Sequence, residues 1–255
     1  MTKPPTITAT ADDLGERVAD VIVAAWRAAS EQGRDFLLGC PTGRTPAPVF
    51  KALAARAAGL DASKLVIVLM DEYLVQTSDG FAAVEATQPY SCVGYAKLHI
   101  IEPIAAATGE SPRLWAPDPS DPEAYDRRID QAGGIDVFLL ASGASDGHIA
   151  FNPPGSPRDS RTRVIKLPDT TRRDNMATFP VFAHLEDVPS HGISVGVSTI
   201  VDQTRLALLM LTGSDKQIAF AHISAASDYD PSWPATAVAA CRDYQVFADA
   251  EAARH

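Results

Sequence analysis

The sequence predicts an α/β fold: a doubly wound, mostly parallel sheet flanked by helices, Rossmann-like and three-layered. Short apolar runs of strand length recur along the chain, and segments with helical periodicity lie between them. The runs are almost continuously apolar, which is typical of strands buried on both faces of a parallel sheet. The chain has 255 residues, of which 46% are hydrophobic, so we expect a single domain over residues 1–255.

The first part of the chain predicts a helix followed by a strand, a loop and a second helix. Residues 10–29 carry apolar side chains at three- and four-residue steps after a start rich in Thr and Asp, which predicts a capped amphipathic helix. The apolar run 36–38 predicts a strand, and the glycine- and threonine-rich residues 39–45 predict a turn. Pro46 then stands at a plausible first position of the next helix.

The same unit repeats in type along the rest of the chain. Each further strand is predicted from a buried apolar run, and each further helix from its periodicity. The predicted strands are 65–70, 135–141 and 206–211, and the predicted helices are 90–98, 122–131 and 215–224. The stretch 115–122 is rich in Pro and Asp and predicts a surface loop.

Charge and composition exclude several classes of function. The net charge of −10 argues against nucleic-acid binding, and no apolar run reaches the length of a membrane span. Three scattered cysteines (Cys40, Cys92 and Cys241) form neither a disulfide framework nor a zinc motif. We therefore expect a cytoplasmic protein with no zinc site, no nucleic-acid partner and no membrane partner.

Open parallel sheets bind ligands outside the carboxyl ends of their strands. Four segments follow predicted strands directly and are candidate site segments on position alone. They are 40–45, 71–73, 142–156 and 212–216.

Two of these segments suit an anion. Residues 39–46 end a strand and open a helix, where backbone N–H groups and hydroxyls can cradle an anion. The alternative is a tight turn in which Gly43 supplies an unusual backbone angle. Lys216 begins a later helix and could reach a phosphate, although most such lysines are simply solvated. The candidate anion-binding residues are Thr42, Gly43, Arg44, Thr45 and Lys216.

The other two segments suit proton transfer. Asp71 and Glu72 emerge from a buried strand with Tyr73 beside them, and a carboxylate held there could move a proton on or off carbon. Asp146 precedes His148 by two residues in a glycine-punctuated loop, so that the carboxylate could orient the imidazole. Structural alternatives remain, because acidic pairs after strands often cap helices and loop histidines often bond the backbone.

Taken together and in order, the segments resemble the glucosamine-6-phosphate deaminase and 6-phosphogluconolactonase superfamily over most of the chain. The matching motifs are 39–46, Met70-Asp-Glu-Tyr73, Asp146-Gly-His-Ile-Ala-Phe-Asn152, 194–198, and 212–213 with Lys216. The resemblance implies a small anionic sugar as substrate, Asp71 as the base for the C2 proton, and His148 with Asp146 as the ring-opening pair. It also implies that Lys216 and the Thr42–Thr45 loop hold a phosphate. The reaction it implies needs acid/base groups and no metal or organic cofactor, and the resemblance permits a homo-oligomer.

The chain departs from the deaminase pattern at two positions. Pro153 stands after Phe-Asn, where the deaminases have a glutamate, so a proton-relay carboxylate is missing. Ala177 stands two residues after Asn175, where the family's phosphate-binding arginine is expected. Arg44, Arg172 or Arg173 are the candidate replacements for that arginine.

Three hypotheses follow for the function. The leading one is acid/base isomerisation of an aldose to a ketose, with or without deamination, on a sugar phosphate or a related anionic sugar. The second is hydrolysis of a sugar lactone with His148 as general base, because the superfamily's lactonases keep the Asp-Gly-His loop without the glutamate. The third is a non-catalytic sugar-phosphate sensor that has kept the pocket.

Overall fold

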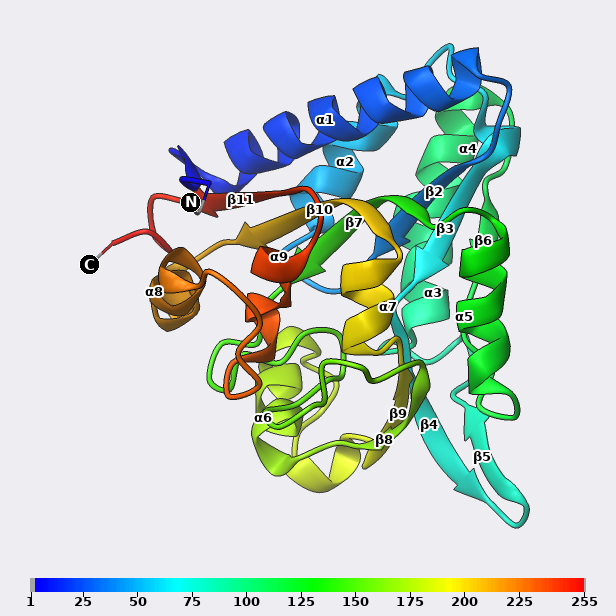
Figure 1. Ribbon diagram of the computed structural model, residues 1–255. Coiled ribbons are helices and arrows are strands. Elements are labelled where there is room, and N and C mark those ends of the chain that lie inside the picture. Colours follow the sequence, from blue (N-terminus) through cyan, green and yellow to red (C-terminus); the bar gives the residue numbers. More distant parts are fainter. Residues whose placement is uncertain (1–2, 255) are drawn as a thin grey trace.

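Seven parallel strands form the central sheet of the computed structural model, which describes residues 3–254 (Figure 1). Their order across the sheet is β1-β11-β10-β7-β2-β3-β6, so that the chain winds outward in both directions from the middle. The strands are β1 (Thr6–Thr8), β2 (Phe36–Cys40), β3 (Leu65–Leu69), β6 (Arg113–Trp115), β7 (Ile135–Ala141), β10 (Thr204–Leu211) and β11 (Tyr244–Asp249).

Helices cover both faces of this sheet, and the strand side chains alternate between two cores. In β3, Leu65, Ile67 and Leu69 join one buried cluster, whereas Val66 and Val68 join the other. The first cluster contains side chains of α1 (Ala11–Glu31), α2 (Ala47–Arg56), α3 (Cys92–Ala96) and α4 (Glu102–Thr108). The second contains side chains of α5 (Pro122–Gln131), α7 (Val197–Asp202), α8 (Gln217–Ala225) and α9 (Ala237–Ala240). The predicted three-layer, doubly wound fold is confirmed.

A second, antiparallel sheet extends from one side of the central sheet, with α6 (Asp169–Thr178) beside it (Figure 1). Its order is β5-β4-β9-β8, formed by β4 (Asp71–Thr77), β5 (Gly80–Ala83), β8 (Arg163–Lys166) and β9 (His191–Ser194). This sheet was not predicted from the sequence, which marked 71–73 only as the segment directly after a buried strand. Asp71 starts a new strand because it pairs with Ser194, a partner more than a hundred residues away.

The elements that the sequence predicted differ from the observed ones mostly at their ends. Residues 122–131 and 135–141 form the predicted helix and strand. The helix predicted at 90–98 begins at Cys92 and runs on through a π-helical turn, Lys97–Ile101, into α4. The strands β1, β6 and β11 were not predicted, because two of them have only three residues and the third has a mixed polar sequence. Four 3-10 turns complete the fold: Ala62–Lys64, Leu185–Asp187, Ser214–Lys216 and Pro234–Thr236.

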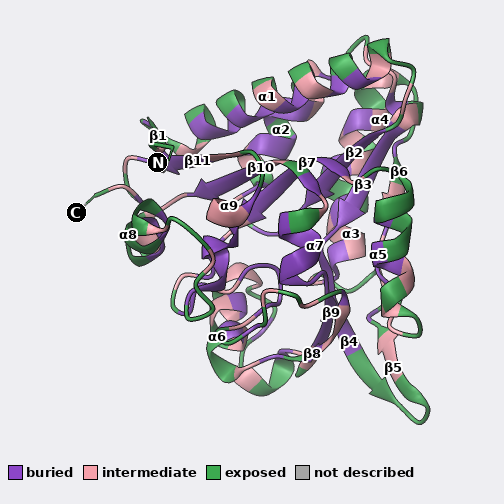
Figure 2. Ribbon diagram, in the orientation of Figure 1, coloured by how far each residue is buried: buried purple, intermediate pink, exposed green. Residues whose placement is uncertain are grey.

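Figure 2 shows that burial is concentrated in the central sheet and on the inward faces of its helices. The three cysteines are free and buried. Among the described residues, no helix is both long enough and apolar enough to cross a membrane.

Candidate active site

A cavity of about 560 Å³ opens at the carboxyl ends of the central strands. The loops after β2, β7 and β10, the start of β4 and one side of α6 line it, so the four segments predicted from their position lie together. Of the predicted site residues, those that line this cavity are Thr42, Arg44, Thr45, Asp71, Tyr73, His148 and Lys216.

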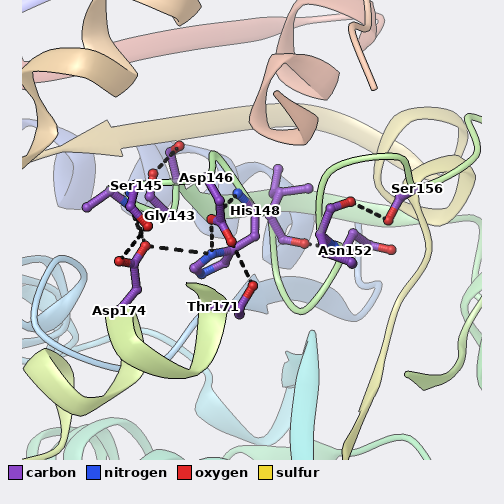
Figure 3. Close-up of polar contacts among 12 residues, drawn as sticks. Gly143, Ser145, Asp146, His148, Asn152, Ser156, Thr171 and Asp174 are labelled. Carbon is purple, nitrogen blue, oxygen red and sulfur yellow. Dashed lines mark hydrogen bonds and ion pairs between the residues drawn. The ribbon is translucent and has the colours of Figure 1, made fainter. Parts of the chain in front are cut away.

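The loop after β7 holds a carboxylate and an imidazole in direct contact (Figure 3). Asp146 Oδ1 lies 2.6 Å from His148 Nδ1 and also accepts the backbone N–H of His148. Thr171 in α6 donates its hydroxyl to Asp146 Oδ2 at 2.8 Å. With Nδ1 bonded to the carboxylate, Nε2 has no partner among residues 3–254 and is available to a ligand in the cavity.

Two glycines make this arrangement possible. A Cβ at Gly143 would lie 2.2 Å from His148 Nδ1, so only glycine leaves room for the imidazole. Gly147 has φ +67°, and a Cβ there would meet the indole of Trp233 at 2.3 Å. The backbone between Asp146 and His148 therefore packs directly on an aromatic ring, which fixes the direction of both side chains.

The local contacts make Asp146 a stronger acid. Burial raises its pKa, but the hydrogen bonds and charge of His148 and the hydroxyl of Thr171 outweigh burial and lower the pKa well below its ordinary value. Asp146 therefore stays ionised at neutral pH, where it fixes the imidazole tautomer and stabilises a protonated His148.

Asp71 lies in a very different environment at the start of β4. Its side chain is only 6% exposed. Burial raises its pKa to about 7, the thiol of Cys92 opposes that shift by hydrogen bonding, and the charge of Glu72 adds to it. A carboxylate with a pKa near neutrality is a competent general base at carbon.

The two residues after Asp71 have structural contacts as well. Glu72 lies outside the cavity and caps α3, since its carboxylate accepts the N–H groups of Cys92 and Val93 and the hydroxyl of Ser91. Burial raises the pKa of Glu72, and these hydrogen bonds oppose that shift. Tyr73 lines the cavity and contacts four aromatic rings, and its buried hydroxyl finds no partner within residues 3–254.

The cationic end of the cavity lies between the loops after β2 and β10. Lys216 Nζ donates to the carbonyl of Ser142 at 2.8 Å, and burial lowers its pKa. Arg44 is exposed and lies 3.7 Å from Asp215. Gly43 does not line the cavity; with φ +100° it forms the turn, and its carbonyl accepts the hydroxyl of Tyr95.

Two predicted residues lie outside the cavity, and their contacts are structural. Arg172 turns away from the cavity and donates to the carbonyls of Leu185 and Val188. The structure therefore gives no support to Arg172 as a replacement anion ligand. Asn152 is fully buried, where its amide donates to the carbonyl of Val195 and its oxygen accepts from Arg163.

Three further residues line the cavity: Arg173, which the sequence named as a possible replacement for the missing arginine, and Asp174 and Cys92, which it did not mark as site residues. Arg173 is exposed, and among the described residues it has neither a hydrogen-bond nor an ion-pair partner. It precedes Ala177 by four residues, so the two lie on the same face of α6. Asp174 accepts three hydrogen bonds from Ala144 and Ser145, and its Oδ2 lies 4.0 Å from His148 Nδ1 (Figure 3). Cys92 contacts Asp71. Neither motif nor spacing marked Asp174 or Cys92, because tertiary packing brings them to the cavity.

Asp146, His148 and Asp174 each place a potential metal-ligand atom within 4.8 Å of the others. Both carboxylates already accept hydrogen bonds from protein groups, and His148 Nδ1 bonds Asp146. These contacts fit an orienting network for the imidazole better than an open cation site.

Comparison with known proteins identifies relatives along nearly the whole chain. The sequence pattern described as glucosamine-6-phosphate isomerases/6-phosphogluconolactonase matches residues 9–247. A glucosamine-6-phosphate deaminase of Pseudarthrobacter chlorophenolicus is 40% identical over 205 residues, which cover 80% of this chain and 73% of that protein. The deaminase of Bacillus velezensis is 32% identical over 250 residues and covers 95% of each chain.

Solved structures show the same architecture. A monomeric glucosamine-6-phosphate deaminase superposes with a TM-score of 0.84 at 25% identity, covering 98% of this chain and 99% of that chain. A 6-phosphogluconolactonase from Shewanella baltica superposes with a TM-score of 0.72 at 20% identity, covering 98% of each chain.

Proposed function

Because the chain belongs to the glucosamine-6-phosphate isomerase/6-phosphogluconolactonase family, we propose that its cavity isomerises a phosphorylated aldose by moving a proton from C2 to C1. The observation that carries this proposal is a pair of proton carriers on one cavity. Asp71 has a pKa raised to about 7 by burial, and His148 is oriented by Asp146.

The reaction begins with opening of the sugar ring. His148 Nε2 exchanges a proton with the ring oxygen and the C1 hydroxyl, while Asp146 and the nearby Asp174 stabilise the imidazolium. Asp174 provides a second carboxylate beside His148 in a chain that has Pro153 in place of the expected glutamate. Pro153 itself does not line the cavity.

The next step takes place at carbon. The Asp71 carboxylate removes the C2 proton of the open-chain aldose, and an enol-type intermediate forms. Return of the proton to C1 gives the ketose; where C2 carries an amino group, the product is an imine, which water converts to the ketose and ammonia.

Cations at the far end of the cavity suit the substrate's phosphate. Lys216, Arg44 and the loop hydroxyls of Thr42 and Thr45 line that end. Arg173 lies one helical turn from Ala177, where the family's arginine is missing, and it has no protein partner within residues 3–254. We infer that Arg173 supplies the forked contact. All these residues come from one chain, so the site needs no second copy, and three buried free thiols suit a reducing compartment such as the cytoplasm.

The test follows the C2 hydrogen directly. Purified protein is incubated in deuterated water with sugar phosphates, including a 2-amino sugar phosphate, while NMR records deuterium at C2 and ammonia release. We expect exchange in the wild type, a loss of about 10²- to 10⁴-fold in Asp71→Asn, and nearly unchanged ligand binding. Retained exchange in Asp71→Asn would remove Asp71 from the base role.

Lactone hydrolysis is the second candidate. It is favoured by the shared fold of the 6-phosphogluconolactonase structures and by an Asp-His pair that needs no glutamate at position 153. With His148 as general base for water, acid would be released from a sugar lactone with little dependence on Asp71. A pH-monitored assay on wild type, His148→Ala and Asp71→Asn separates the two reactions, and binding without any turnover would favour a sensor.

A further inference from the structure

Cys92 lies between Asp71, the candidate base, and the anion-binding loop after β2. Its Sγ is 3.4 Å from Asp71 Oδ1 and 3.4 Å from Thr42 Oγ1. The side chain is 1% exposed and contributes to the cavity wall. One sulfur atom thus touches both the candidate base and the anion-binding loop.

The start of α3 fixes this position. Ser91 is the N-cap and accepts the N–H of Gly94, while Glu72 accepts the N–H of Cys92 at 2.9 Å. A Cβ at Gly94 would lie 2.2 Å from the carbonyl oxygen of Ala86, so the start of α3 packs closely on the backbone of Ala86. The thiol is therefore held by backbone contacts that do not depend on a ligand.

The chemistry of the thiol determines the direction of both hydrogen bonds. Burial raises the pKa of Cys92 well above its ordinary value, so the sulfur stays protonated. A thiol has one hydrogen, and the carboxylate of Asp71 is its stronger acceptor. The hydroxyl of Thr42 then donates to the sulfur, which gives a chain from Thr42 through Cys92 to Asp71.

We propose that Cys92 is a positioning residue that links the anion-binding loop to the general base and sets the proton affinity of Asp71. The proposal rests on the proposed function of Asp71. The other titratable groups near Asp71 are Glu72, Tyr73 and Tyr125. Within residues 3–254, the thiol is the one side chain that donates a hydrogen bond to the Asp71 carboxylate.

Two substitutions at Cys92 should shift the pKa of Asp71 in opposite directions. Cys92→Ala removes the donor, so the carboxylate loses stabilisation and the Asp71 pKa rises. Cys92→Ser supplies a stronger donor in nearly the same shape, so the pKa falls. We expect shifts of about half a pH unit to one unit in each case, because a single neutral hydrogen bond has a modest net effect. Below neutral pH, a smaller fraction of Asp71 is ionised in Cys92→Ala, so its exchange rate should fall about three- to tenfold. In Cys92→Ser a larger fraction is ionised, so the rate should rise by a similar factor.

The measurement titrates Asp71 itself, without substrate. Carboxyl ¹³C NMR of aspartate-labelled protein, assigned with Asp71→Asn, gives the pKa in the wild type and in both variants. Cys241→Ala is the matched control, because this buried thiol does not line the cavity and donates to the carbonyls of Ile200 and Ala237. It should leave both the Asp71 titration and the exchange rate unchanged.

A double substitution tests the link to Thr42. Thr42→Val alone should raise the Asp71 pKa by a smaller amount, because the sulfur loses its donor and becomes a weaker donor itself. In a Cys92→Ala background, Thr42→Val should add nothing. Fully additive shifts would overturn the coupling.

Shifts of equal sign in Cys92→Ala and Cys92→Ser, or none in either, would overturn the role of Cys92. That result is distinct from failure of the proposed function, in which wild-type protein shows a titrating Asp71 but no exchange with any sugar phosphate. If Cys92→Ala does not fold, the Asp71 pKa is compared between Cys92→Ser and Cys241→Ser. Both variants replace a buried thiol by a hydroxyl of the same size, so only Cys92→Ser should lower the Asp71 pKa.

Discussion

Asp71 lines the cavity, and Asp146 contacts His148, which also lines it. The surroundings of the two carboxylates differ. Asp71 sits where β3 passes into β4, between two sheets, and receives a single hydrogen bond from a thiol. Asp146 lies in a loop and accepts hydrogen bonds from His148 and Thr171. Burial therefore controls the first carboxylate and raises its pKa to about 7, while polar partners control the second and lower its pKa.

Under the proposed function, the contrast suits each group to a different role. A carboxylate close to neutrality can take up and release a proton, whereas one that stays ionised can only orient and stabilise a neighbour. Residue type alone would not separate them, because both are aspartates that follow buried strands.

The largest expected effect comes from removing the charge of Asp146. Asp146→Asn keeps the shape but can present its amide N–H to His148 Nδ1, which favours the wrong tautomer. We expect kcat to fall about 10²- to 10⁴-fold with a small change in KM. Steady-state kinetics checks this, and a loss below threefold would contradict the orienting role.

The two aspartates should affect stability with opposite signs. Asp71 has a folded pKa above its ordinary value of 3.8, so it costs stability as pH rises from about 4 to about 7, and the cost is complete above that range. Asp71→Asn should therefore be more stable than wild type at alkaline pH by on the order of a few kcal/mol.

Asp146 contributes in the other direction. Its pKa is lowered, so its stabilisation is present above the unfolded value and is lost as pH falls through the folded one. Asp146→Asn should be less stable than wild type at neutral pH, and the difference should vanish in strong acid. Urea unfolding of both variants at acidic and alkaline pH checks this pair, and equal signs at alkaline pH would contradict the contrast.

The pH dependence of C2 exchange gives a smaller effect. Because the base must be ionised, kcat/KM should rise about tenfold per pH unit below about 7 and level off above it. A profile already flat near pH 5 would mean that Asp71 is not the titrating base. Asp71→Glu is the matched variant, since it keeps a carboxylate and should shift the profile without removing it.

The smallest expected effect concerns the two neighbouring arginines of α6. Arg173→Ala should raise KM for a sugar phosphate about three- to tenfold with little change in kcat, because an exposed charge contributes modestly. Arg172→Ala is the matched control and should lower the melting temperature without changing KM, since its guanidinium binds the carbonyls of Leu185 and Val188. The reverse pattern would assign the phosphate contact to Arg172.

The sequence alone predicts the fold class, the family and most of the segments that line the cavity. The strands at 65–69 and 135–141 are continuous apolar runs, and their burial on both faces follows from composition. Because parallel strands bind ligands at their carboxyl ends, the sequence also predicts that Thr42, His148 and Lys216 lie together, and all three line the cavity.

Tertiary structure alone decided the rest. The pairing of β4 with β9 joins segments more than a hundred residues apart, so no local pattern marks Asp71 as the start of a strand. The direction of a side chain on a helix depends on how the helix docks, so the sequence could not separate Arg172, which turns away from the cavity, from Arg173, which lines it, and it did not mark Asp174.

What the sequence determined by itself is the kind of chemistry, because glycine punctuation, an Asp-Gly-His loop and a carboxylate after a buried strand are local features. The tertiary structure decided the protonation of those groups. Burial of Asp71, the donors to Asp146 and the thiol beside Asp71 all come from contacts across the fold, and a pKa follows from those contacts and not from residue identity.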